Sequence, residues 1–264
     1  MAAVSQGLID FANEHRQPAG PGVEVIETPR YRIVLQPDFP IPGPNSVSWI
    51  RCNPDEVDDV IREVRDKVAP RRLPLMWTLD PGTRPADFAT HLAARNAIPD
   101  SHAPEVDVMV LSADSHLRSP DIEGLELQDA LAGAETFRAA DQVNAEAFRA
   151  SEQDRGSLER RRANQLASGN RRLILATMHG EPAGSAGMTV FAPSGAIING
   201  GAVRPKFRGR GVYRALVAER LRFGREAGVA GLAVWGGPMS KPILEKLGFV
   251  TVGWRRFYLD RTTI

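Results

Sequence analysis

The sequence predicts a mixed α/β protein in which strands and helices alternate along the chain. The first observation is the presence of short runs that are apolar throughout, such as Leu75–Leu79, as is typical of strands covered on both faces. The second is the helical spacing of apolar residues between such runs, for example in Ala134–Phe148. The third is a polar, proline-bearing stretch, Ser112–Asp121, between two alternating series. We therefore expect domains at residues 1–118 and 119–264.

Capping and turn residues mark the elements of the expected N-terminal domain. Asn53 can cap a helix that has Pro54 at its first position, and acidic residues follow in its first turns. Residues 105–111 alternate between apolar and polar, which favours a strand. The expected elements are a short helix before residue 17, strands at 23–26, 31–35 and 47–52, a helix at 53–68, a strand at 75–79, a helix at 86–95 and a strand at 105–111.

Similar signals define the expected C-terminal domain. Residues 179–182 have the composition of a hairpin turn, and Gly248 is placed to end a short helix. The expected elements are a strand at 122–128, helices at 134–148 and 157–167, strands at 172–178, 183–191 and 196–203, a helix at 211–227, a strand at 229–235, a helix at 240–247 and a strand at 250–259.

A basic turn follows the expected strand 196–203. Pro205 has no N–H to give to a strand ladder, and Gly209 and Gly211 let the backbone turn sharply. The helix after it presents N–H groups without intrahelical partners and the positive end of a dipole. The turn also carries four cationic side chains: Lys206, Arg208, Arg210 and Arg214. It predicts a cradle for a phosphate-bearing ligand, with an ordinary structural connector as the alternative.

Two motifs at this spacing give the C-terminal half a family resemblance. Arg208-x-x-Gly211 follows a Val-x-Pro strand end, and Glu245-Lys-Leu-Gly-Phe249 comes one strand and one helix later. The combination resembles the GCN5-related N-acetyltransferase (GNAT) family over about residues 120–264. The family signature is Arg/Gln-x-x-Gly-x-Gly/Ala at the start of the helix that binds the coenzyme A (CoA) pyrophosphate. The sequence departs from the family at Tyr213, where Gly or Ala is usual, and at Leu244, where tyrosine is frequent.

The resemblance implies a GNAT fold in the C-terminal half and acetyl-CoA as the co-substrate. In the family, a bulge opens two central strands for the pantetheine arm, and Gly200-Gly201 favours a bulge, although these glycines could instead only make room for packing. The N–H of Ala202 or Val203 would stabilise the oxyanion of the thioester. The residues implied in CoA binding are Ala202, Val203, Arg208, Gly209, Arg210, Gly211, Val212, Tyr213 and Arg214.

Acyl transfer to an amine needs a base, because an aliphatic ammonium has a pKa near ~10.4. The strand before the basic turn offers Asn199 and no carboxylate. The segment between the first two helices borders the acceptor site in the family, so Glu152 and Asp154 are candidates there, and Glu146 is another; for each, the alternative is a solvated charge. With Leu244 in place of a tyrosine, Ser240 is the nearest hydroxyl, although it could simply cap the helix. We expect direct attack by the amine in a ternary complex, because Cys52 has no partner histidine in view.

The N-terminal half is similar to a reduced second copy of the same domain, as in tandem acetyltransferases. The order of its expected elements and the segment Met76–Phe88 carry this likeness. It has no Arg-x-x-Gly-x-Gly turn, so we expect it not to bind CoA in the usual way. The alternative is an unrelated small α+β domain.

Composition limits the kinds of partner that we expect for the protein. A net charge of +1 gives no global field that points to nucleic acid or a membrane. No run approaches the roughly 20 apolar residues of a membrane span. One cysteine and five histidines without ligand spacing predict no disulfide framework and no metal site. We expect a cytoplasmic monomer or homodimer.

The function expected from these features is N-acetyl transfer from acetyl-CoA to a small-molecule or protein amine. A non-catalytic acyl-CoA-binding or sensing module is the first alternative, because Tyr213 and Leu244 depart from the family pattern. An enzyme that uses the same cradle for other thioester chemistry is the second.

Overall fold

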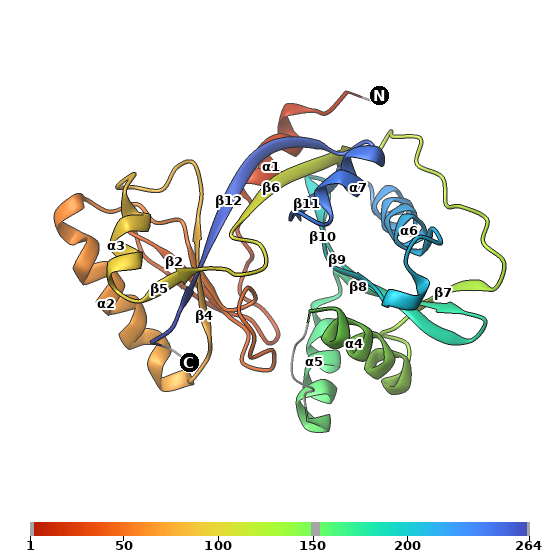
Figure 1. The fold of residues 1–264 in the computed structure, drawn as a ribbon, viewed down its shortest axis with the longest axis horizontal. Helices are drawn as coiled ribbons and strands as arrows, with labels where there is room; N and C mark the ends of the chain where they lie inside the picture. The colour runs from red at the N-terminus through yellow and green to blue at the C-terminus, as the bar shows by residue number, and fades with distance from the viewer. Residues whose placement is uncertain (1–2, 149–153, 263–264) are drawn as a thin grey trace. The chain divides into compact units, whose positions relative to one another are not determined.

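The computed structural model of the chain describes residues 3–148 and 154–262 (Figure 1). The contacts divide the chain into two compact units. Unit 1 comprises Met1–His15 and Val108–Val252, and unit 2 comprises Arg16–Asp107 and Gly253–Ile264. Each unit therefore contains a segment from the opposite end of the chain.

The sheet of unit 1 is mixed, with strand order β6-β11-β10-β9-β8-β7. Strands β7 to β10 form an antiparallel series, whereas β10 and β11 are parallel. The strands are β6 (Glu105–Ser112), β7 (Leu125–Asp129), β8 (Arg171–Met178), β9 (Glu181–Phe191), β10 (Gly195–Val203) and β11 (Gly231–Gly236).

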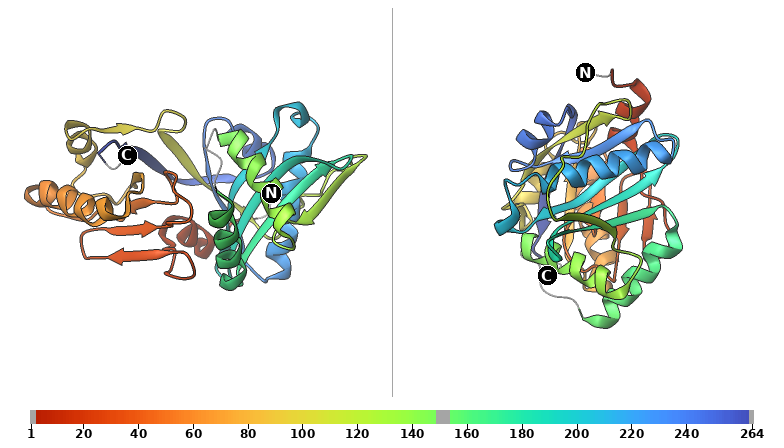
Figure 2. Two further views of the ribbon diagram at one scale, coloured as in Figure 1. Left: turned by 90° about the horizontal axis from the view of Figure 1, so that it is seen from below. Right: turned by 90° about the vertical axis from the view of Figure 1, so that its right-hand side faces the viewer.

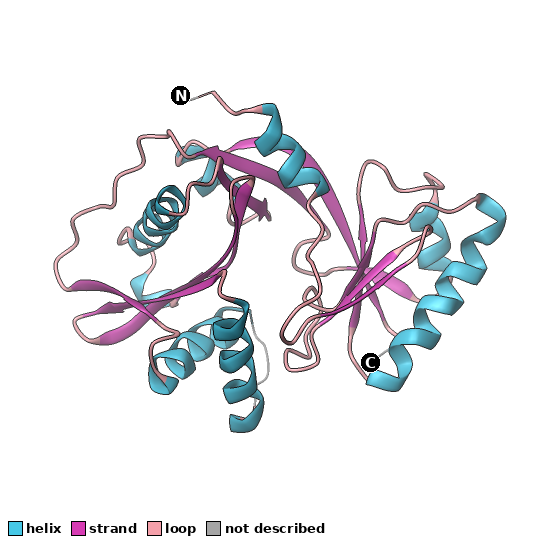
Figure 3. Ribbon diagram, turned by 180° about the vertical axis from the view of Figure 1, so that it is seen from behind, coloured by secondary structure: helices cyan, strands magenta, loops and turns pink. Residues whose placement is uncertain are grey.

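Helices cover both faces of this sheet (Figure 3). Helix α4 packs on β8, β9 and β10 from one side, and α6 packs on the same strands from the other and lies along them (Figure 2, right). On the α6 side, Val217 and Leu221 share a core cluster with Met188 and Ile198. The helices of unit 1 are α1 (Gln6–Glu14), α4 (Ala134–Phe148), α5 (Arg155–Ser168), α6 (Val212–Glu226) and α7 (Lys241–Lys246), with a short 3₁₀ turn at Pro205–Phe207.

Unit 2 contains its own run of neighbouring strands and its own core. Its strand order is β1-β2-β3-β4-β12, and β5 also pairs with β12. The core is built around the fully buried Tyr31, Trp77 and Phe88. The elements are β1 (Glu24–Glu27), β2 (Arg32–Leu35), β3 (Ser46–Ser48), α2 (Val57–Val68), β4 (Leu75–Leu79), α3 (Phe88–Ala94), β5 (Ala97–Pro99) and β12 (Val250–Asp260), with 3₁₀ turns at Pro54–Glu56 and Ala69–Arg71.

The two units share one topological feature. In unit 1, the parallel strands β10 and β11 are joined by α6. In unit 2, the parallel strands β3 and β4 are joined by α2. A strand, a crossover helix and a neighbouring parallel strand therefore occur in each unit.

The predicted fold class is confirmed, and most expected elements lie within a few residues of their predicted bounds. The strand predicted at 47–52 ends at Ser48, because Trp49 has a positive φ of 56° that an extended strand cannot accommodate. The strand β5 was not predicted. The units differ from the expected division at residue 118 in the exchange of the two chain ends, and separate domains at 1–118 and 119–264 stay a prediction.

Candidate active site at the β10 bulge and the start of α6

The basic turn has the geometry of an anion cradle. Gly209 and Gly211 both have positive φ, 74° and 84°, and α6 begins directly after Gly211. Gly211 occupies the N-cap position and offers no side-chain cap, and the first α6 backbone bond runs from the Ala215 N–H to the Gly211 carbonyl. The N–H groups of the first helical turn, among them those of Val212 and Tyr213, therefore have no partner within the helix. They and the helix dipole form a site that favours an anion.

The cationic side chains of the turn divide into two groups. Arg208 donates its Nε–H to the Val203 carbonyl at 3.1 Å, and Lys206 forms an ion pair with Glu181. Both are thereby held by the protein. Arg210 and Arg214 are exposed, and neither takes part in an ion pair between described residues. These two arginines are the cations best able to reach a ligand at the start of α6.

Strand β10 carries the predicted bulge. Its register with β9 shifts between Asn199 and Ala202, and Gly200 has a positive φ of 57° that favours glycine. The pairing with β11 covers only Ala196 with Leu232 and Ile197 with Ala233. The bulged segment is therefore not paired with β11, and its backbone groups on that side can bind a ligand.

The remaining predicted residues lie around this segment or apart from it. Asn199 is exposed immediately before the bulge, and Ala202 and Val203 are buried immediately after it, opposite Ser185 and Gly184 of β9. The carboxamide of Asn199 lies over Gly187, where any Cβ would collide with it.

Two further candidates, Asp154 and Ser240, lie on other elements. Asp154 caps α5: it accepts hydrogen bonds from the Ser157 N–H at 3.0 Å and from the Ser157 hydroxyl at 2.7 Å. These bonds lower the pKa of the Asp154 carboxyl. Ser240 precedes α7 and donates its hydroxyl to the Gly237 carbonyl at 3.3 Å. Glu152 lies outside the described residues.

Three polar residues near the bulge were not predicted: Asn144, Ser185 and Arg220. On the α4 side, Asn144 donates to the Ser185 hydroxyl at 3.3 Å and lies within 4 Å of the position that a Cβ on Gly200 would take. On the α6 side, Arg220 is only 1% exposed and lies against Gly201. The sequence carries only a weak signal for Arg220. It is a charged residue four positions after Leu216, on the face of α6 that the apolar spacing directs into the core.

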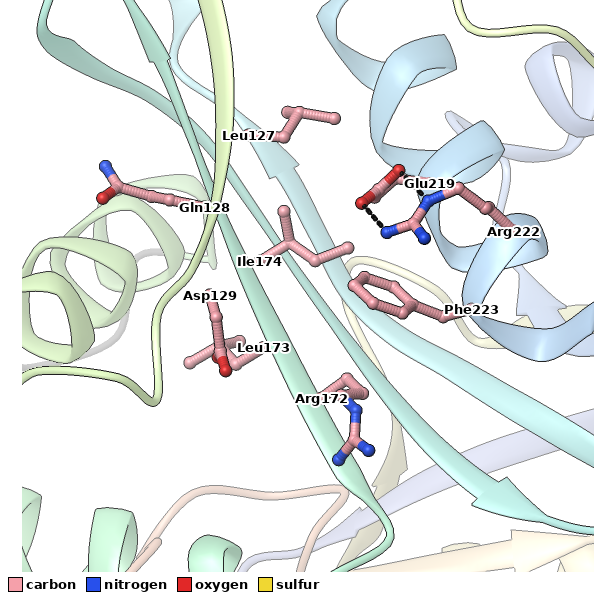
Figure 4. Close-up of a pocket in the computed structure, with 9 residues that line it drawn as sticks. All are labelled: Leu127, Gln128, Asp129, Arg172, Leu173, Ile174, Glu219, Arg222 and Phe223. Atoms are coloured by element: carbon pink, nitrogen blue, oxygen red, sulfur yellow. Dashed lines mark hydrogen bonds and ion pairs between the residues drawn. The ribbon is translucent and has the colours of Figure 1, made fainter. Parts of the chain in front are cut away.

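A separate pocket of about 230 Å³ lies between β7, β8 and the middle of α6 (Figure 4). Figure 4 shows that its Glu219 and Arg222 face one another, and they form an ion pair of 2.6 Å. It contains no residue of the bulge or the basic turn, so it is not part of the candidate site. Its lining residues are Leu127, Gln128, Asp129, Arg172, Leu173, Ile174, Glu219, Arg222 and Phe223.

Two other features are absent from the described residues. Within 3–148 and 154–262, no group of three or more His, Cys, Asp or Glu side chains is placed to hold a metal ion. Over the same residues, no helix has the length and apolar character that crossing a membrane requires.

Residues 137–249 match the model of the acetyltransferase (GNAT) family, so this part of the chain is a GNAT domain. The matched range includes the β10 bulge, the basic turn and α6. No curated protein sequence is similar enough to match.

Solved structures show the same fold over most of the chain. A GCN5-related N-acetyltransferase from Kribbella flavida is similar at 19% identity and a TM-score of 0.63, over 97% of this chain and 92% of that chain. A tandem GNAT protein from the clavulanic acid biosynthesis pathway is similar at 17% identity and a TM-score of 0.58, over 91% and 84%. A GCN5-related N-acetyltransferase from Sphaerobacter thermophilus is similar at 15% identity and a TM-score of 0.60, over 87% and 80%.

Proposed function

We propose that the protein transfers an acetyl group from acetyl-CoA to an amine by direct attack in a ternary complex. The GNAT match of residues 137–249 indicates an N-acetyltransferase in general. The observation that carries the proposal is the conjunction of the unpaired β10 bulge with the glycine turn and the bare N-terminus of α6. One chain segment thus offers backbone donors for a thioester and for a pyrophosphate.

The residues present fit the two ends of acetyl-CoA. The N–H groups after Gly211, with Arg210 and Arg214, would hold the pyrophosphate. The open backbone between Asn199 and Val203 would hold the pantetheine amides and the thioester, and the N–H of Ala202 or Val203 would support the oxyanion. In the proposed reaction the amine nitrogen bonds to the carbonyl carbon, and the carbon–sulfur bond breaks. The sulfur leaves with the electron pair as a thiolate, and the nitrogen gives up a proton.

The proton acceptor is proposed to be one of the carboxylates predicted from the sequence. Asp154 has a second role as a helix cap, and its lowered pKa makes it a weaker base. Glu146 forms an ion pair of 2.7 Å with Arg204, directly after β10. Asn199 stands beside the bulge and would orient the amine through its carboxamide. Ser240 is proposed as a proton donor on the thiolate side, because Leu244 is fully buried and apolar.

Unit 2 is proposed to be a degenerate GNAT-like copy that does not bind CoA. Its strand–helix–strand arrangement, β3-α2-β4, parallels that of unit 1. The turn before α2 carries Asp55 and Glu56 instead of arginines, and anionic side chains repel a pyrophosphate. Strands β2 and β3 pair in a continuous register, from Arg32 opposite Ser48 to Val34 opposite Ser46.

The partners and location of the protein are proposed from composition and family. The acceptor is a small-molecule or protein amine, and the net charge of +1 favours neither nucleic acid nor a membrane surface. We place the protein in the cytoplasm as a monomer or homodimer.

Calorimetry with acetyl-CoA, followed by an assay of thiol release with a panel of amines, tests this function. The proposal requires saturable acetyl-CoA binding and amine-dependent release of CoA. Tight binding without turnover on any amine would favour the alternative of an acyl-CoA-binding or sensing module. Absence of binding would overturn both.

A further inference from the structure

Arg220 is a buried charge without an acidic partner among the residues that the structure describes. Its side chain on α6 is 1% exposed. The Nε–H donates to the Leu216 carbonyl of the same helix at 3.0 Å, and Nη1 donates to the Gly187 carbonyl of β9 at 3.4 Å. Nη2 has no hydrogen-bond partner, and Arg220 takes part in no ion pair between described residues. A guanidinium stays charged in proteins, and burying one without a counter-ion is energetically costly.

The guanidinium lies directly behind the bulge of β10. A Cβ on Gly201 would be 3.5 Å from Nη2 of Arg220 and 3.7 Å from Nη1. The same Cβ would be 3.1 Å from Cε2 of Tyr213. The Tyr213 ring and the Arg220 guanidinium therefore cover the α6 side of the bulge, while Gly200 faces Asn144 on the α4 side.

The tyrosine beside Arg220 is also the residue at which the sequence departs from the family motif. It occupies the motif position where the GNAT family usually has Gly or Ala, and it lies seven residues, about two turns, before Arg220 on α6. Burial lowers the pKa of Arg220, and the nearby Tyr213 phenol acts in the opposite direction. The unusual tyrosine and the buried arginine thus form one contact behind the bulge.

We propose that Arg220 is an electrostatic positioning residue for acyl transfer, whose charge behind Gly201 stabilises the negative charge that forms on the thioester at the bulge. This inference rests on the proposed function. Negative charge appears first on the carbonyl oxygen, when the amine attacks, and then on the sulfur, when the carbon–sulfur bond breaks. A positive charge a few ångströms away in a low-dielectric core favours both states over the neutral thioester.

The proposal predicts opposite effects on stability and on activity. Replacing a buried unpaired charge by an apolar side chain of similar length is often neutral or stabilising. Arg220→Met is therefore expected to resist denaturant as well as or better than the wild type, while its kcat falls about ten- to hundredfold with little change in KM. Arg220→Lys keeps the charge and is expected to recover part of the lost kcat.

Binding of CoA separates an electrostatic role from a merely structural one. The probes are CoA and an analogue in which hydrogen replaces the thiol, titrated by calorimetry from pH 6 to pH 9. Wild-type protein is expected to bind CoA more tightly as the thiol ionises, and Arg220→Met to lose about tenfold of this gain, which corresponds to a rise of about one unit in the pKa of the bound thiol. The analogue is expected to bind both proteins equally at every pH.

Three results would overturn the proposal. One is an unchanged kcat in Arg220→Met. Another is an equal loss of affinity for CoA and for the analogue, which would assign Arg220 a structural role. The third is a kcat in Arg220→Lys as low as in Arg220→Met. Arg220→Gln, which is also neutral, serves for the CoA titration if Arg220→Met does not fold. In each case wild-type binding and turnover leave the proposed function standing, whereas a wild type that does not bind acetyl-CoA would remove both.

Discussion

At the scale of single residues, Gly211 meets two requirements at once. Its φ of 84° is a conformation that glycine adopts without strain, and it immediately precedes the free N–H groups of α6. Gly211→Glu is expected to weaken acetyl-CoA binding at least about a hundredfold, because a carboxylate would face the pyrophosphate. Calorimetry measures this loss.

A matched control separates the charge of Gly211→Glu from its effect on the backbone. Gly211→Asn adds the same Cβ, which would approach Cδ1 of Ile122 to 3.0 Å, but asparagine tolerates positive φ and is neutral. It should retain most of the affinity. Similar losses in both variants would show that backbone strain, and not a nearby pyrophosphate, causes the effect.

Cys52 is another residue for which the structure gives a definite expectation. It lies in the core of unit 2, 8% exposed, and burial raises the pKa of its thiol. A buried protonated thiol is a poor nucleophile. Cys52→Ala should therefore retain full turnover and lose about 1 kcal/mol of unfolding free energy. A large fall in kcat in protein that remains folded would contradict direct transfer.

The candidate site could be predicted from the sequence only where its signals are local. The glycines and arginines of the basic turn act through backbone conformation and charge at adjacent positions, and Gly200-Gly201 marks the bulge in the same local way. Arg220 and Asn144 could not be found like this. Their place at the bulge depends on contacts of α6 and α4 with β9 and β10, which no neighbouring residue specifies.

At the scale of elements, β12 is held in unit 2 by a buried carboxylate. Asp260 is fully buried, and it accepts hydrogen bonds from Nε of Arg65 at 2.9 Å and from Nε1 of Trp77 at 2.9 Å. Burial alone would raise the pKa of Asp260, but these bonds and those from Thr262 outweigh it, and the pKa is lowered. The end of the strand is thereby tied to α2 and β4.

Asp260→Asn is expected to lower the unfolding free energy by about 3 kcal/mol at pH 7, because it leaves Arg65 without its anion. The contribution of the wild-type carboxylate is complete above its unfolded pKa near ~3.9 and is lost as the pH falls from there through the folded pKa. Denaturant titrations at pH 7 and pH 3 should thus bring wild type and variant closer at pH 3. A constant difference would mean that Asp260 does not act through its charge.

Most elements could be predicted because their periodicity and caps lie within the element itself. The exception, β5, has only Ala97–Pro99, and Ile98 within it is 39% exposed. Three residues are too few to show an alternating pattern, and the strand exists through its pairing with β12, far along the chain. Local sequence patterns do not indicate such a pairing.

At the scale of the whole molecule, the exchanged ends bear on how the chain can be divided. A fragment of residues 119–264 lacks α1 and β6 from unit 1. It would expose the neighbours of Leu8 and Phe11, and it would uncover the edge of β11 beside β6. We expect this fragment to unfold at lower denaturant than residues 108–264, which keep the part of β6 that belongs to unit 1. The full chain should be the most stable of the three.

Circular dichroism during denaturation gives the order of these midpoints. Because both fragments contain β10 and α6 entire, a difference between them reports on packing and not on loss of the candidate site. Equal midpoints for all three proteins would mean that the predicted boundary at 118/119 separates independently stable domains after all.

The position of β12 also has a consequence for synthesis of the chain. Among the strands, β1 to β4 emerge from the ribosome first, yet β12, the partner of β4, is made after all the other strands and helices. At ordinary elongation rates the edge of β4 waits on the order of 10 to 30 seconds for that partner. Unit 2 is thus begun early and completed last, and over this interval the nascent chain carries an open strand edge that could pair with a neighbouring chain.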